Sequence, residues 1–124
     1  MISLIIPVRG ERVGLWATVA SAKEALRKSP HEIIAVLNEP DGAEFPLPAQ
    51  WMHQLGMCKV VFTNDDGPAA ARNRGAGMAR GDVYFFADAH CVFPADYFEK
   101  LLAEMEDSGA DAVFGGTKFC GDVT

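Results

Sequence analysis

The sequence predicts an α/β fold in which one parallel sheet is flanked by helices, and three observations predict it. Short apolar runs of strand length alternate with longer segments of helical periodicity along all 124 residues. The runs are apolar at nearly every position, as in strands that are buried on both faces. No repeat, low-complexity tract or internal linker interrupts the alternation. We therefore expect a single domain, 1–124, whose parallel strands are joined by right-handed crossovers.

The first half of the chain supplies three of the expected strands, at residues 2–7, 31–37 and 58–63. Residues 12–28 are expected to be helical, because an apolar stripe with spacings of 4, 3 and 4 runs through Leu15, Val19, Ala22 and Leu26. Ser29 and Pro30 end this helix. The segment 38–48 contains three prolines and is expected to be a loop, followed by a short helix at 49–55.

The second half continues the alternation. We expect a helix from Pro68 to Ala79 or Arg80, a strand at 82–87, a helix opened by Pro94 and a fifth strand at 111–115. Proline suits the first position of a helix. Gly81 is expected just past the end of the third helical segment, as the glycine that commonly ends helices.

Composition excludes several classes of function. The net charge is −6 and no basic block is present, which argues against a nucleic-acid-binding face and against docking on anionic membranes. No apolar run approaches the ~18 residues that indicate a membrane span, and the first ten residues lack the features of a signal peptide. Cys58, Cys91 and Cys120 lack metal-ligand spacing, so we expect reduced thiols in a cytoplasmic protein.

Signatures of other well-known active sites are missing from the sequence. The turn after the first strand, RGERVG at 9–14, does not have the G-x-G-x-x-G spacing of dinucleotide sites. The sequence contains neither the G-x-x-x-x-G-K-[ST] phosphate loop nor the G-x-S-x-G turn of serine hydrolases. We therefore exclude NAD-type and phosphate-loop nucleotide sites and a serine nucleophile.

The residues after the fourth expected strand predict a metal site. Asp88 and His90 lie two positions apart, directly after the apolar run 83–87. Alternate side chains of an extended chain project to the same side, so a carboxylate and an imidazole would converge at the carboxyl end of a strand. Open α/β sheets bind their ligands there. Such ligands suit Mn²⁺ better than Mg²⁺, and the cation would hold a diphosphate. The alternative is a loop Asp beside a loop His.

Three other residues are candidates for nucleotide binding. Arg72 lies in the second turn of the helix that starts at Pro68, where the helix N-terminus attracts phosphate and a guanidinium adds bidentate contacts. Glu11 and Asn38 follow the first and second strands, so together they could read a uracil edge or a ribose. Each could equally be a turn residue, and acids are favoured in the first turn of a helix in any case.

These segments, in this order, resemble family 2 glycosyltransferases with the GT-A fold. Residues 3–8 (SLIIPV) are similar to the opening strand of that family, and residues 67–75 (GPAAARNRG) to its G-x-x-x-A-R-N-x-G helix. ARGD at 79–82 followed by FADAH at 86–90 resembles its A-x-G-D and D-x-D segments. The resemblance covers nearly the whole chain. The DAHC segment also resembles the D-x-H motif of polypeptide N-acetylgalactosaminyltransferases.

The resemblance implies a Rossmann-like GT-A sheet and a metal-dependent transfer of sugar from a nucleotide-diphosphate sugar, with a UDP-sugar as the expected donor and an unknown acceptor. By the same resemblance, the donor site consists of Pro7, Val8, Glu11, Asn38, Arg72 and Asp88, with Asp88 and His90 binding Mn²⁺ or Mg²⁺. Two departures are visible: Leu37 stands where the family has an acid, and His90 where it has the second Asp.

The catalytic domains of the family are longer, so the resemblance implies a truncated domain without the half that carries the acceptor site and the catalytic base. We name no catalytic residue. A later antiparallel strand of the GT-A sheet would fit beside the fourth strand; without it, the apolar edge along 83–87 is expected to drive self-association. Two alternatives remain: a non-catalytic UDP-sugar-binding module, and a nucleotidyltransferase of related shape, which GER at 10–12 fits poorly.

Overall fold

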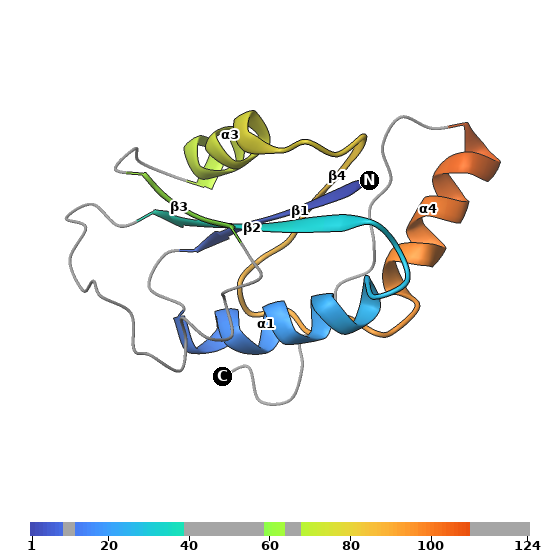
Figure 1. The fold of residues 1–124 in the computed structure, drawn as a ribbon, viewed down its shortest axis with the longest axis horizontal. Helices are drawn as coiled ribbons and strands as arrows, with labels where there is room; N and C mark the ends of the chain where they lie inside the picture. Colours follow the sequence, from blue (N-terminus) through green and yellow to red (C-terminus); the bar gives the residue numbers. More distant parts are fainter. Residues whose placement is uncertain (9–11, 39–58, 64–67, 110–124) are drawn as a thin grey trace.

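The computed structural model describes residues 1–8, 12–38, 59–63 and 68–109. Its strands are β1 (Ile2–Val8), β2 (His31–Asn38), β3 (Lys59–Thr63) and β4 (Val83–Phe86). They form one parallel sheet in the order β3-β2-β1-β4 (Figure 1). The helices are α1 (Arg12–Ala25), α3 (Pro68–Met78) and α4 (Tyr97–Ser108). The prediction of a parallel sheet flanked by helices is confirmed.

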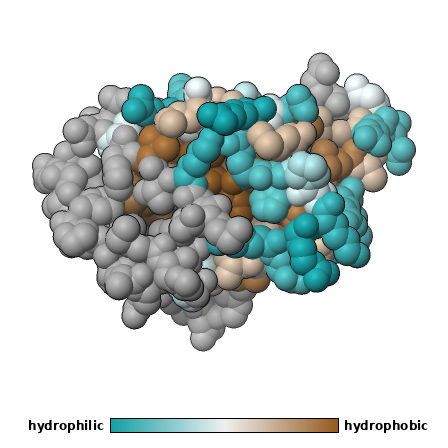
Figure 2. Space-filling view, in the orientation of Figure 1, coloured by the Kyte–Doolittle hydropathy of each residue, from teal (hydrophilic) through white to brown (hydrophobic). Residues whose placement is uncertain are grey.

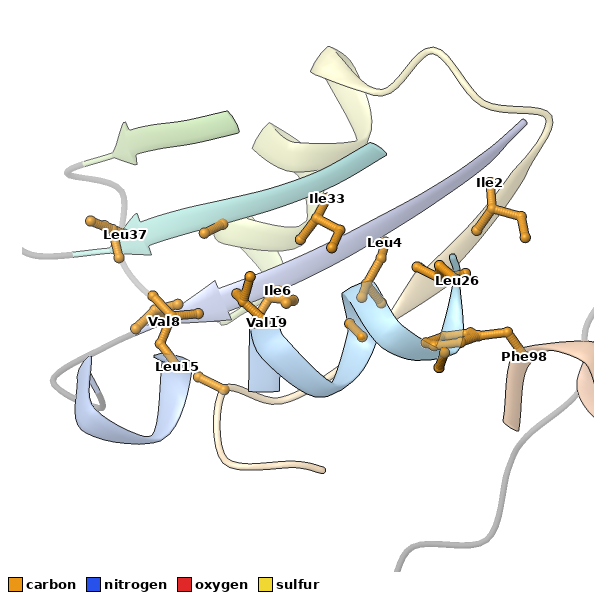
Figure 3. Packing of buried hydrophobic residues seen from close by; sticks show 14 residues of the cluster. Ile2, Leu4, Ile6, Val8, Leu15, Val19, Leu26, Ile33, Leu37 and Phe98 are labelled. Atoms are coloured by element: carbon orange, nitrogen blue, oxygen red, sulfur yellow. The ribbon is translucent and has the colours of Figure 1, made fainter. Parts of the chain in front are cut away.

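Two apolar layers hold the sheet between its helices, with α1 on one face and α3 on the other (Figure 1). Alternate residues of β1 belong to opposite layers: Leu4 and Ile6 pack toward α1, whereas Ile5 packs toward α3. Figure 3 shows the larger layer, in which the stripe of α1 meets the sheet and Phe98 of α4 closes one end. On the face shown in Figure 2, hydrophilic side chains cover much of the described part of the surface, with apolar ones visible between them.

Small residues let α3 lie close to the sheet. Ala71 is fully buried, and a Cβ on Gly75 would lie 2.5 Å from Ile5 Cγ2 and 3.0 Å from Val36 Cγ2. Gly75, the last residue of the segment that resembles the family's helix motif, therefore has a packing role. Because one face of α3 is held against β1 and β2, its remaining residues face outward, Arg72 among them.

The prediction that Gly81 ends α3 is wrong. The helix stops at Met78, and positive φ among the described glycines is found at Gly109 alone, where φ is 68° at the end of α4. Gly81 is needed for another reason: a Cβ there would lie 2.6 Å from the Met1 carbonyl oxygen and 2.8 Å from the Ser3 nitrogen. This close approach brings the chain alongside β1 immediately before β4 begins.

Other element ends differ from the prediction by a few residues. The first helix ends at Ala25, three residues before the predicted end, and the chain continues through turns to Pro30. Pro94 precedes α4 and does not begin it: its carbonyl accepts a hydrogen bond from Tyr97 N–H at 3.1 Å, and Asp96 is the N-cap residue. The predicted helix at 49–55 and the fifth strand at 111–115 lie outside the described residues.

One carboxylate joins the amino ends of the strands. Glu32 on β2 accepts hydrogen bonds from the Ser3 hydroxyl on β1, from Lys59 Nζ on β3 at 2.9 Å and from the Arg80 N–H before β4. The Ser3 hydroxyl oxygen also accepts a bond from Gly81 N–H at 2.8 Å. Burial opposes ionisation of Glu32, but the hydrogen bonds from Arg80, Ser3 and Lys59 outweigh it and lower its pKa from 4.5 to about 2.

The low pKa of Glu32 makes part of the stability pH-dependent. Between pH 4.5 and about 2 the unfolded chain binds a proton that the folded chain does not, so this contribution is full above that window and disappears as the pH falls through it. Glu32→Gln is expected to cost about 2 kcal/mol at pH 7. Urea denaturation should show the difference between Glu32→Gln and wild type shrinking from pH 5 toward pH 2; a pH-independent difference would contradict the assignment.

Candidate functional site

The carboxyl ends of the strands bring the predicted site residues to one edge of the sheet. Pro7 and Val8 end β1, Asn38 ends β2, and β3 ends at Thr63. Because the strands are parallel and in register, these ends are neighbours: Val8 is opposite Leu37, and Asn38 is opposite Thr63. α3 begins shortly after β3, so its N-terminus starts from this same edge. Ligands of open α/β sheets bind at such an edge.

β4 delivers Asp88 to this edge beside β1. Its last pair joins Phe86 to Ile5, and Ala87 N–H then donates to the Ile5 carbonyl at 3.1 Å. Asp88 follows at once, so it leaves the sheet near the carboxyl end of β1. The structure thus agrees with the predicted placement of Asp88 after a strand of the sheet.

The local geometry of Asp88 and His90 differs from the prediction. The extended chain ends at Phe86, and Ala89 and His90 form a turn, so alternation along a strand does not explain how this pair is arranged. Burial instead describes how the three residues of this segment are arranged. Ala89 is only 1% exposed, whereas Asp88 is exposed and His90 half-buried. The two polar side chains therefore flank a side chain that points into the core.

Two hydroxyl groups of α1 hold this turn, and the sequence analysis missed both. Thr18 Oγ1–H donates to the Ala89 carbonyl at 2.9 Å, and Phe93 N–H donates to Ser21 Oγ at 3.0 Å. Thr18 is a polar residue next to the apolar stripe of α1, and its side chain is fully buried. A hydroxyl at a buried helical position is the signal that indicates a hydrogen-bond partner, but the partner lies 71 residues away in the sequence.

The other predicted site residues differ in burial and in the face of the sheet or helix on which they lie. Pro7 is half-buried on the face of β1 that is turned toward α3, in register with Val36. Val8 is 1% exposed within the apolar layer under α1, which leaves its backbone for a ligand. Arg72 is exposed on α3. Glu11 and the side chain of Asn38 lie outside the described part of the structure.

Asp88 and His90 are the residues of the turn that could hold a divalent cation together with oxygen atoms of a ligand. In the described residues, His, Cys, Asp and Glu side chains form no group of three that could hold a metal by itself. Asp88 and His90 offer a carboxylate oxygen and an imidazole nitrogen, which Mn²⁺ accepts. The cation would complete its coordination with diphosphate oxygens and water, as nucleotide-bound metals commonly do.

The cysteines and the character of the helices bear on the setting of the site. Cys91, next to His90, carries a reduced, half-buried thiol; Cys58 and Cys120 lie outside the described residues. Among the helices that the structure describes, none has the length and apolar character needed to cross a membrane.

Several known proteins are similar to this chain in sequence. The sequence model described as glycosyl transferase family 2 matches residues 3–124. Glycosyltransferase AglE of Haloferax volcanii is 24% identical over 95% of this chain and 40% of its own length. Dolichol-phosphate mannosyltransferase of Pyrococcus furiosus is 25% identical over 92% and 32%. N-acetylgalactosaminyltransferase 7 of Drosophila melanogaster is 29% identical over 83% and 18%. The chain thus spans well under half the length of these relatives.

Solved structures share the fold. Residues 1–349 of S. aureus TarS, in complex with UDP-GlcNAc, superpose with a TM-score of 0.69 at 20% sequence identity, covering 89% of this chain and 32% of that one. The complex of the same protein with UDP gives a TM-score of 0.68 at 19% identity, over 89% and 33%.

Proposed function

Because the chain belongs to the family 2 glycosyltransferases, we propose that it is the donor-binding part of a metal-dependent enzyme that transfers sugar from a UDP-sugar to an acceptor. The observation that carries the proposal is the meeting of three features at one edge of the sheet. These are the carboxyl end of β1, the N-terminus of α3 and the turn with Asp88 and His90. Residues 1–124 would act as one nucleotide-sugar-binding domain.

Each group at the edge has a role in this proposal. Bound Mn²⁺ or Mg²⁺ supplies Lewis-acid neutralisation of the charge on the leaving diphosphate. Asp88 and His90 would hold that cation, and the N–H groups at the start of α3, with Arg72, would stabilise the charge of the phosphates. Pro7, the Val8 backbone, Glu11 and Asn38 would line the nucleoside pocket. The catalytic base is unassigned.

The choice of UDP over other nucleotides draws support from the relatives. TarS, which shares the fold, was solved with UDP and with UDP-GlcNAc. One relative is named an N-acetylgalactosaminyltransferase, in line with the D-x-H resemblance of residues 88–90. Another relative is named a mannosyltransferase, so the proposal specifies a UDP-sugar and leaves the sugar open.

Calorimetric titration of the 124-residue chain with UDP, with and without Mn²⁺, tests the proposal. UDP is expected to bind in the presence of Mn²⁺ and much more weakly when EDTA removes the metal. Binding of a UDP-sugar without hydrolysis or transfer would favour the non-catalytic binding module. A folded protein that binds no uridine nucleotide in either condition would refute both.

We also propose that the edge of the sheet at β4 pairs with a second copy of the chain. Within the described residues, β4 is hydrogen-bonded to β1 alone, and its Tyr84 and Phe86 side chains are 44% and 50% exposed. Exposed apolar edge strands promote such pairing.

Light scattering should therefore show a mass that rises with protein concentration, and Phe86→Lys should give a monomer by placing a charge on the edge. Val92→Lys changes an equally apolar side chain, 44% exposed and outside β4, and should leave association unchanged. A monodisperse wild-type monomer over a wide concentration range would contradict pairing at this edge.

A further inference from the structure

The turn that carries Asp88 and His90 is attached to α1 by a short hydrogen-bond relay. Thr18 Oγ1–H donates to the Ala89 carbonyl at 2.9 Å. Ser21, three residues later on the same helix, accepts from Phe93 N–H at 3.0 Å and donates its own hydroxyl proton to the Thr18 carbonyl at 3.0 Å. Two hydroxyl groups one helical turn apart therefore bind the chain at residues 89 and 93.

These bonds lie on both sides of each proposed metal ligand. Asp88 is preceded by Ala87, whose N–H is bonded to the Ile5 carbonyl of β1, and is followed by Ala89, whose carbonyl is bonded to Thr18. His90 lies between the bonds at Ala89 and Phe93. The backbone on either side of the two side chains is thus fixed to β1 and α1, although the turn itself belongs to neither.

Burial makes the bond from Thr18 the stronger constraint. Thr18 is 0% exposed and Ala89 is 1% exposed, so water cannot replace the hydroxyl group without disturbing the apolar layer. A buried carbonyl that loses its donor bears the full cost of desolvation, and the chain relieves that cost by moving. Any such movement of Ala89 also moves the two side chains on either side of it.

We propose that Thr18 and Ser21 are positioning residues of the donor site, which set the separation and direction of Asp88 and His90 through the backbone of the turn. This inference rests on the proposed function. Both hydroxyl groups act on the site through backbone atoms of the turn, at Ala89 and Phe93. Groups that orient metal ligands typically change metal affinity by about 10–100-fold when they are replaced.

The test is the affinity for Mn²⁺ in the presence of saturating UDP, measured by calorimetry on the full chain. Thr18→Val keeps the shape of the side chain and removes the hydroxyl, and Mn²⁺ affinity is expected to fall about tenfold. Thr18→Ser restores the hydroxyl and should bind Mn²⁺ like wild type. Ser21→Ala removes the second attachment at a half-buried position and should also weaken Mn²⁺ binding.

Two controls separate positioning from loss of stability. Ile33→Val trims a buried side chain of β2 in the same apolar layer without altering the relay, so it should lower the melting temperature and leave Mn²⁺ affinity unchanged. Ser108→Ala removes an exposed hydroxyl bond within α4, from Ser108 to the Glu104 carbonyl at 2.7 Å, and should also leave Mn²⁺ affinity unchanged.

The outcomes distinguish this inference from the proposed function. If wild type binds no Mn²⁺ with UDP, the proposed function fails first. If wild type binds but Thr18→Val and Ser21→Ala bind equally well, positioning by α1 is refuted. Positioning by α1 is also refuted if Ile33→Val weakens Mn²⁺ binding as much as Thr18→Val does, or if Thr18→Ser does not bind Mn²⁺ like wild type. If Thr18→Val does not fold, the comparison of Mn²⁺ affinity between Ser21→Ala and Ser108→Ala decides the question.

Discussion

Asp88→Ala is expected to abolish the Mn²⁺ dependence of UDP binding. The carboxylate of Asp88 is the proposed anionic ligand of the cation, and its loss should cost more than the ~10–100-fold in metal affinity that follows from changes beside a ligand. The side chain is exposed, so alanine should leave the fold intact. Calorimetry with UDP, with and without Mn²⁺, measures the effect, and thermal unfolding checks that the variant is folded.

Asp107→Ala is the matched control, because it removes the same charge from an exposed position on α4. It should bind Mn²⁺ and UDP like wild type. His90→Asp offers a complementary change: it keeps a ligand at this position and makes the pair all-oxygen, which should shift the preference from Mn²⁺ toward Mg²⁺. If Asp88→Ala retains wild-type Mn²⁺ dependence, the cation does not bind at this turn.

Phe98→Ala is expected to lower the free energy of unfolding by about 3–5 kcal/mol, because it opens a cavity in a well-packed layer. Phe98 is 2% exposed. Its ring centroid lies 4.9 Å from those of Phe85 and Phe93 and 5.3 Å from that of Tyr97. The Phe98 ring thus contacts three parts of the chain: β4, the segment that follows the proposed metal site, and the start of α4. Urea denaturation followed by circular dichroism measures the loss.

Phe98→Leu separates the loss of volume from the loss of the aromatic contacts. Leucine fills much of the space, so this variant should lose substantially less stability than Phe98→Ala. If Phe98→Ala costs less than about 1 kcal/mol, the cluster does not hold α4 against the sheet in the way the structure indicates.

The strands were predictable because burial on both faces leaves little room for other residue types. The apolar runs at 2–7 and 31–37 match β1 and β2 to within one residue at their ends. The identity of the carboxyl edge follows from the parallel connections alone. The sequence pattern alone therefore predicts that Asp88 follows a strand of the sheet.

Features that depend on distant partners could not be predicted. Gly81 has the position of a helix-ending glycine, yet its requirement comes from the Met1 carbonyl, about which the local sequence carries no information. The bond from Thr18 to Ala89 spans 71 residues of chain. The turn at 89–90 replaced the predicted extension because the Ala89 side chain is buried there, which only the packing of α1 against the sheet determines.

Binding of a cation at the Asp88 turn is the central requirement of the proposed donor site. Crystals of the chain soaked with MnCl₂ and UDP, measured at the manganese absorption edge, test it directly. We expect an anomalous peak within bonding distance of an Asp88 carboxylate oxygen and a His90 ring nitrogen, with UDP bound between this turn and the N-terminus of α3. An intact domain with UDP bound and no manganese at Asp88 would contradict it.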